Sequence, residues 1–161
     1  MNITRVLIGM DESKYADHAA EYGFKLARQF NAAVGIVSII EPIMASVSPM
    51  NDTTFGLPFE GIADVNSGEM INAQNQSADA LLNRIVQKYS EGITVTQYTD
   101  YGSSADGIIN CAAQFGADLI IIGTHHRSGF DRLLMGSVAE EVVRNSRVPV
   151  LVVPMNEEED K

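Results

Sequence analysis

Residues 123–137, which read GTHHRSGFDRLLMGS, combine glycine, histidine, arginine and serine in a spacing that could bind an anion. The segment follows an apolar run and leads into a pattern typical of a helix that begins near Ser137. Gly136 and Ser137 therefore stand at a helix N-terminus, where unpaired backbone N–H groups and the helix dipole favour a phosphate. Arg127 could neutralise phosphate oxygens. The alternative is that Ser137 only caps the helix and the arginine is a solvated surface charge.

The two adjacent histidines, His125 and His126, raise the question of a metal site. Neighbouring side chains in an extended segment point in opposite directions, so these two make a poor chelating pair. We therefore expect no metal site formed by the protein itself. The phosphate-loop motif of P-loop enzymes is absent, and no sequence signature of a hydrolytic triad is present. No catalytic residue is predicted on these grounds.

Short apolar runs alternate with helical patterns along the chain, which is typical of an α/β fold with a parallel sheet. We expect one domain with five strands and with helices on both faces of the sheet, joined by right-handed crossovers. Ligands of such sheets bind outside the carboxyl ends of the strands, where the strand order reverses. Asp11, just after the first strand, is then either a ligand contact or a cap for the first helix. The strands are expected near residues 5–9, 34–40, 93–101, 119–122 and 150–153, with Pro154 ending the last, and the helices near 16–30, 70–89, 108–115 and 137–145.

The charge and composition of the chain indicate which kinds of partner it can bind. The chain has 161 residues and a formal net charge of -10, which disfavours binding to nucleic acid or to anionic lipid. No apolar run is long enough to cross a bilayer, and the N-terminus reads as a strand rather than a secretion signal. The single cysteine, Cys111, lies on an apolar helical face and is predicted to be a core residue. We expect a cytoplasmic protein that binds a small phosphate ligand.

The predicted domain covers residues 1–154 and is followed by an acidic tail at 155–161. Between about residues 41 and 68 the periodicity breaks down among prolines, glycines and methionines. A loop of this length is unusual inside a compact domain. It is predicted to be a mobile segment that acts as a lid or a partner surface, or else a variable crossover connection.

Several motifs together resemble the universal stress protein family. In that family a G-x-x-G, nine residues and then G-S or G-T wrap the phosphates of ATP or a related nucleotide. The resemblance implies a Rossmann-like fold of the adenine nucleotide alpha hydrolase type and an adenine nucleotide as ligand, with Mg²⁺ carried by the nucleotide. The matching segments are VLIGMD at 6–11, ADGII at 105–109, DLIIIGT at 118–124, GSVAE at 136–140 and PVLVV at 149–153.

The resemblance also implies roles for individual residues. It places Asp11 and the backbone near Ile39 beside the adenosine part of the nucleotide, and Gly123 at the first glycine of the signature. Its phosphate-binding end corresponds to Gly136, Ser137 and the amide of Val138, which follow one another in the chain. Arg127 is the predicted cationic contact.

His126 departs from the family pattern, because it stands at the second signature glycine. If that position requires a positive φ, a side chain there costs about 1 kcal/mol, and histidine tolerates such a φ better than most residues. The imidazole either obstructs the phosphate site or donates a hydrogen bond to it. His126 is therefore included among the predicted binding residues.

Three functions follow from these observations. The first is a stress-response regulatory protein that binds ATP, ADP or AMP and forms a homodimer through its last strand. The second is a family member that binds no nucleotide and acts as a dimeric interaction module with an unknown protein partner. The third is a slow ATPase, with His126 or Asp11 near the attacking water. The absence of a catalytic motif favours a binding protein over an enzyme.

Overall fold

The computed structural model describes residues 2–42, 63–126 and 136–156, with the backbone alone at 63–67, 125, 126 and 156. These residues form one five-stranded sheet in the order β3-β2-β1-β4-β5, and every neighbouring pair of strands is parallel. The predicted α/β fold is confirmed. The strands are β1 (Arg5–Met10), β2 (Ala33–Ile40), β3 (Val95–Tyr101), β4 (Leu119–His126) and β5 (Val150–Asn156).

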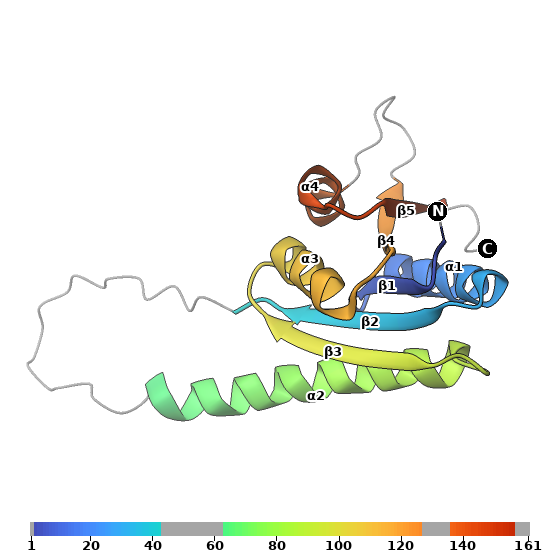
Figure 1. The fold of residues 1–161 in the computed structure, drawn as a ribbon. Coiled ribbons are helices and arrows are strands. Elements are labelled where there is room, and N and C mark those ends of the chain that lie inside the picture. The colour runs from blue at the N-terminus through green and yellow to red at the C-terminus, as the bar shows by residue number, and fades with distance from the viewer. Residues whose placement is uncertain (1, 43–62, 127–135, 157–161) are drawn as a thin grey trace, which may run out of the picture.

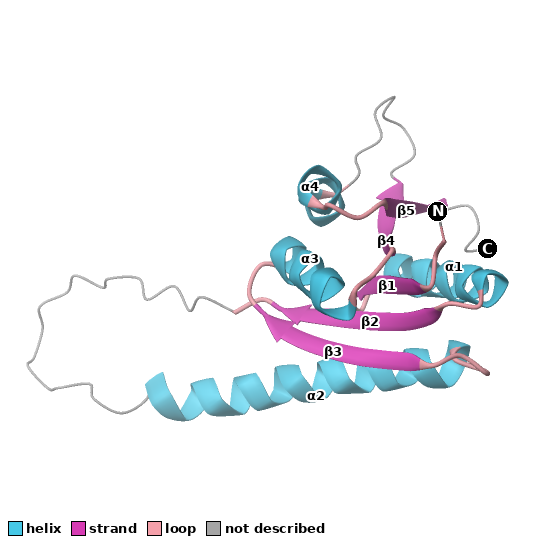
Figure 2. Cartoon of the chain, viewed as in Figure 1, coloured by secondary structure: helices cyan, strands magenta, loops and turns pink. Residues whose placement is uncertain are grey.

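Four helices cover the sheet, two on each face (Figure 1 and Figure 2). On one face lie α1 (Lys14–Phe30) and α2 (Ala63–Tyr89), and on the other α3 (Ser104–Phe115) and α4 (Ser137–Asn145). No helix in the described part of the chain is long and apolar enough to cross a membrane.

The central strands are buried on both faces, which explains their continuous apolar runs. Val6 and Ile8 of β1 pack in the core under α1 and α2, whereas Leu7 between them packs under α3 and α4. Cys111 of α3 belongs to this second core, where it is 4% exposed and burial raises the pKa of its thiol to about 12. The prediction that Cys111 is a core residue is confirmed.

Several elements differ from their predicted bounds, and three of them bear on the predicted loops. β4 continues four residues beyond 122 to His126, and β5 runs through Pro154 to Asn156, because the two strands pair along this whole length. Pro154 does not end the strand, since β5 is at the edge of the sheet, where a missing N–H is tolerated. α2 begins at Ala63, so the last part of the predicted 41–68 segment is helical. The predicted mobility of the segment at about 41–68 stays a prediction, because its residues 43–62 lie outside the described residues.

The order of the strands locates the region where a ligand is expected. From β1 the chain builds outward through β2 to β3 and then returns to place β4 on the other side of β1. The order therefore reverses between β1 and β4. In an open parallel sheet the crevice for a ligand forms at the carboxyl ends of these two strands.

Candidate nucleotide site

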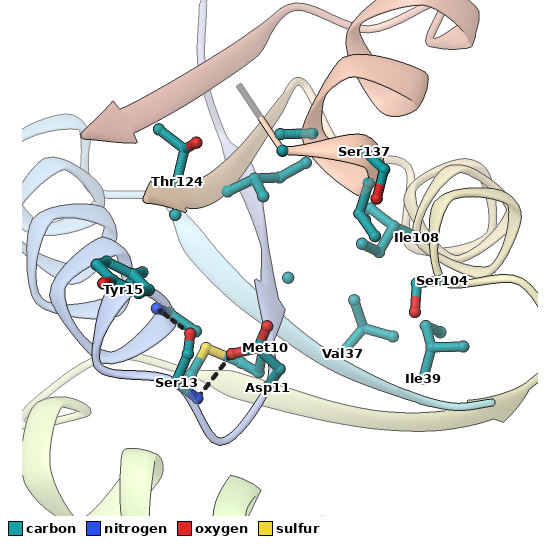
Figure 3. Close-up of a pocket in the computed structure, with 17 residues that line it drawn as sticks. Met10, Asp11, Ser13, Tyr15, Val37, Ile39, Ser104, Ile108, Thr124 and Ser137 are labelled. Carbon is teal, nitrogen blue, oxygen red and sulfur yellow. Dashed lines mark hydrogen bonds between the residues drawn. The ribbon is translucent and has the colours of Figure 1, made fainter. Parts of the chain in front are cut away.

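A pocket of about 280 Å³ opens at this reversal point, among the ends of β1, β2 and β4 and the first turns of α1, α3 and α4 (Figure 3). Its volume is near the lower end of the roughly 300–1,000 Å³ typical of small-molecule sites. A neighbouring pocket of about 360 Å³ lies between β2 and α2, and both pockets are lined by Asp11 and Ile39.

The structure brings most of the predicted binding residues to this one pocket. Its lining includes Asp11, Ile39, Gly123, Gly136, Ser137 and Val138. The backbone of His126 lies in β4, while its side chain and the whole of Arg127 are outside the described residues. Sequence reasoning missed four hydroxyl residues of the lining, namely Ser13, Tyr15, Ser104 and Thr124. Their positions in the sequence could have indicated the last two, because Thr124 comes directly after the glycine that follows the apolar run and Ser104 stands at the start of a helical pattern.

The N-terminus of α4 has no side-chain cap among the residues that the structure describes. The N-cap residue is Gly136, with φ 71° and ψ 145°, and Ser137 is already the first helical residue. The alternative that Ser137 caps this helix is therefore wrong. The first backbone bond of the helix runs from Glu140 N–H to the carbonyl of Gly136, 3.0 Å apart. The amides of the first three helical residues, Ser137 to Ala139, consequently have no partner within the helix, and amides of this kind can bind an anion.

The N-terminus of α1, by contrast, is satisfied by the protein itself. Ser13 is its N-cap, and the hydroxyl of Ser13 accepts a hydrogen bond from Ala16 N–H over 3.2 Å. Asp11 does not cap the helix; its Oδ1 accepts from Ser13 N–H over 2.8 Å, which fixes the turn after β1 (Figure 3). The exposed Asp11 carboxylate thus remains at the pocket wall.

The N-terminus of α3 carries a carboxylate from the neighbouring strand end. The N-cap Ser103 makes no side-chain hydrogen bond, but Ser104 donates to Glu41 Oε1 through its hydroxyl at 2.7 Å and its backbone N–H at 3.3 Å. Glu41 follows directly after β2. Of the three helix N-termini at this pocket, α4 is therefore the one without a capping side chain among the described residues.

Gly123 is required by the packing of β4 against α1. A Cβ built on Gly123 would lie 2.2 Å from the backbone oxygen of Tyr15 and 2.5 Å from its carbonyl carbon, far inside van der Waals contact. β4 can pass the first turn of α1 only because this residue has no side chain. Gly123 thus lets α1 come close enough to form a wall of the pocket.

The described lining of the pocket contains no lysine, arginine or histidine. An anionic ligand would accordingly be held by backbone amides and hydroxyl groups rather than by an ion pair with these residues. In the described part of the chain there is also no group of three or more histidine, cysteine or acidic side chains placed to hold a metal ion.

The backbone at His126 does not need glycine. His126 lies in β4 and pairs with Asn156 of β5, so its backbone is extended. Among the described residues other than glycine, only Asn31 has a positive φ. The cost of about 1 kcal/mol that a positive φ would impose on histidine therefore does not arise here.

Comparison with known proteins gives a family for this architecture. The profile of the Universal stress protein family matches residues 2–154. The chain is similar to Universal stress protein MJ0531 of Methanocaldococcus jannaschii, with 32% identity over 149 residues, 92% of this chain and 81% of that protein. It is also similar to Universal stress protein A of Escherichia coli strain K12, with 23% identity over 160 residues, 99% of this chain and the whole of that protein.

Solved structures share the fold, and some of them contain adenine nucleotides. The structure of the protein MJ0577 matches with a TM-score of 0.73 and 23% identity, over 98% of this chain and 99% of that one. A universal stress protein family protein from Arabidopsis thaliana with AMP bound matches with a TM-score of 0.63 and 17% identity, over 98% and 95%. Complexes of other universal stress proteins with cAMP and with dAMP match with TM-scores of 0.57 and 0.54, at 20% and 17% identity and over 95% of this chain.

Proposed function

The chain belongs to the universal stress protein family, and on that premise we propose that it is a stress-response regulatory protein that binds an adenine nucleotide in the pocket between β1 and β4. The observation that carries the proposal is the N-terminus of α4, which has no capping side chain among the described residues and whose first residues line the pocket at the place where phosphate is expected. Relatives of the same fold have AMP, cAMP or dAMP bound.

In the proposed mode of binding, the polar helix end of the pocket holds the phosphate and the apolar wall holds the nucleoside. The phosphate accepts hydrogen bonds from the amides at the start of α4 and from the hydroxyl of Ser137. The nucleoside lies against the apolar side chains of Val37, Ile39 and Ile108, and Asp11 accepts a hydrogen bond from the ribose. His126, at the position of a signature glycine, and Arg127, by its charge, are proposed as further contacts. ATP, ADP and AMP all fit this arrangement in principle, and Mg²⁺ would accompany the longer phosphate chains.

Equilibrium dialysis of the full chain against labelled AMP and ATP, with and without Mg²⁺, tests this function. We expect saturable retention of nucleotide with one site per chain. The described lining has no cationic side chain, so we expect the affinity to depend on the backbone amides more than on salt. No retention at millimolar nucleotide would contradict the proposal and leave the interaction module as the function of the chain.

We further propose that the protein forms a homodimer through β5. β5 is an edge strand with one neighbour, and the half-buried side chains of Val150, Leu151 and Val152 lie along it. An apolar edge of this kind presents unpaired backbone groups to a second copy of the chain.

Light scattering coupled to size-exclusion chromatography tests the dimer. The wild type is expected to elute as a dimer and Val152→Lys as a monomer, because the charge would lie in the strand interface. Val143→Lys is the control, since Val143 is 43% exposed on α4 and its variant should remain a dimer. A monomeric wild type, or dissociation of both variants alike, would contradict dimerisation through β5.

A further inference from the structure

Two of the three helix N-termini at the pocket, those of α3 and α4, differ in their capping, because of these two only α3 receives a carboxylate within the described residues. Figure 3 shows Ser104 of α3 and Ser137 of α4 at this pocket. At α4 the first amides have no side-chain partner. At α3 the corresponding position is occupied by the Glu41 carboxylate, which accepts from both the hydroxyl and the N–H of Ser104. One anion position is thus filled by the protein and the other is left for a ligand.

The carboxylate at α3 pairs with no cation of the described residues. No ion pair in the described part of the chain includes Glu41, and its hydrogen bonds come from Ser104, which carries no charge. Asp11, on the wall shared by the two pockets, likewise takes part in no ion pair among these residues. An anionic group of a ligand that approached Ser104 would meet these negative charges and would also have to displace Glu41.

We propose that Glu41 is a specificity residue that restricts the pocket to ligands with a single phosphate group or chain. This inference rests on the proposed nucleotide site and specifies which nucleotides that site accepts. A nucleoside with a second phosphate on the ribose, such as adenosine 3′,5′-bisphosphate, is excluded, because one phosphate occupies the start of α4 and the second has no free helix N-terminus. A 5′-monophosphate such as AMP avoids this conflict.

The test is the ratio of two dissociation constants, that of adenosine 3′,5′-bisphosphate over that of AMP, measured by calorimetry on the full chain. In the wild type the ratio is expected to be about ten or more, the scale of one like-charge contact near a protein surface. Glu41→Gln removes the charge but retains an oxygen that can accept from Ser104, so α3 stays capped. The ratio should fall severalfold in Glu41→Gln and further in Glu41→Ala, which also frees the amide of Ser104.

Glu12→Gln is the matched control. Glu12, like Glu41, is an exposed carboxylate that lines the neighbouring pocket but not the pocket of α4. Ser104 donates its hydrogen bonds to Glu41, so Glu12→Gln changes the net charge equally and should keep the wild-type ratio. A wild-type ratio near one, an unchanged ratio in Glu41→Gln, or an equal fall in Glu12→Gln would each overturn the role of Glu41 while AMP still binds. If the wild type does not bind AMP at all, the proposed function itself fails, and this inference fails with it.

Discussion

Gly136→Val is expected to weaken AMP binding by about 100-fold. Gly136 has φ 71° and ψ 145°, a region that β-branched residues essentially do not adopt and that costs a side chain about 1–3 kcal/mol. The loop before α4 would have to change its path to relieve this strain. The amides of the first helical turn would then move away from the phosphate position, and each 1.4 kcal/mol of lost interaction lowers the affinity tenfold.

Two control variants, each titrated with AMP in a calorimeter, distinguish a loss of stability caused by backbone strain from a loss of the phosphate contacts. Gly92 has nearly the same φ, 74°, with no atom within 4 Å of a built Cβ, and it does not line the pocket. Gly92→Val should therefore lose similar stability but retain the affinity. Ser137→Ala removes a hydroxyl and leaves the amides, so it should weaken binding by at most about tenfold. If Gly136→Val bound AMP as tightly as Gly92→Val, the ligand would not be held at the start of α4.

Gly123→Ala is expected to lower the free energy of unfolding by about 3 kcal/mol or more. The added methyl group would lie 2.2 Å from the backbone oxygen of Tyr15, and backbone, unlike the end of a side chain, cannot turn aside. Overpacked sites cost about 1–3 kcal/mol where side chains can adjust, so a clash with backbone should exceed that range. α1 would be pushed off β4, and the first turn of α1 is also a wall of the pocket.

Urea denaturation of Gly123→Ala and of Gly9→Ala measures this effect. Gly9 lies across the same pocket, and a Cβ there would meet the Cδ1 atom of Ile108 at 3.1 Å, a flexible side-chain end. Gly9→Ala should therefore cost about 1 kcal/mol or less. Equal stability of the two variants would show that α1 does not pack on β4 as closely as the structure indicates.

The layout of strands and helices could be predicted from sequence because it depends on local patterns. Continuous apolar runs indicated buried parallel strands, and the helical patterns between them indicated the helices that cover the sheet. The ends of β4 and β5 could not be predicted in this way. Residues 123–126 look like a loop and Pro154 like a strand end, but both belong to strands because β4 and β5 pair with each other.

The sequence predicted where the pocket lies, but it did not predict the hydrogen bonds at the helix ends around it. The sequence suggested Asp11 and Ser137 as possible helix caps, and the structure gives these positions to Ser13 and Gly136. A cap depends on backbone dihedral angles, and the sequence alone does not fix them. The contact between Glu41 and Ser104 joins residues 63 positions apart, so no local pattern could have revealed it. The predicted ligand contacts at His126 and Arg127 remain predictions.

The central claim is that a nucleotide phosphate binds to the free amides at the start of α4. Two-dimensional ¹H–¹⁵N NMR during titration with AMP observes these groups individually. The account predicts saturable shifts that are largest for the amides of Ser137, Val138 and Ala139, with small shifts at Ser104, where Glu41 already occupies the helix end. Saturable AMP binding that leaves the three α4 amides unshifted, or no binding at millimolar AMP, would contradict it.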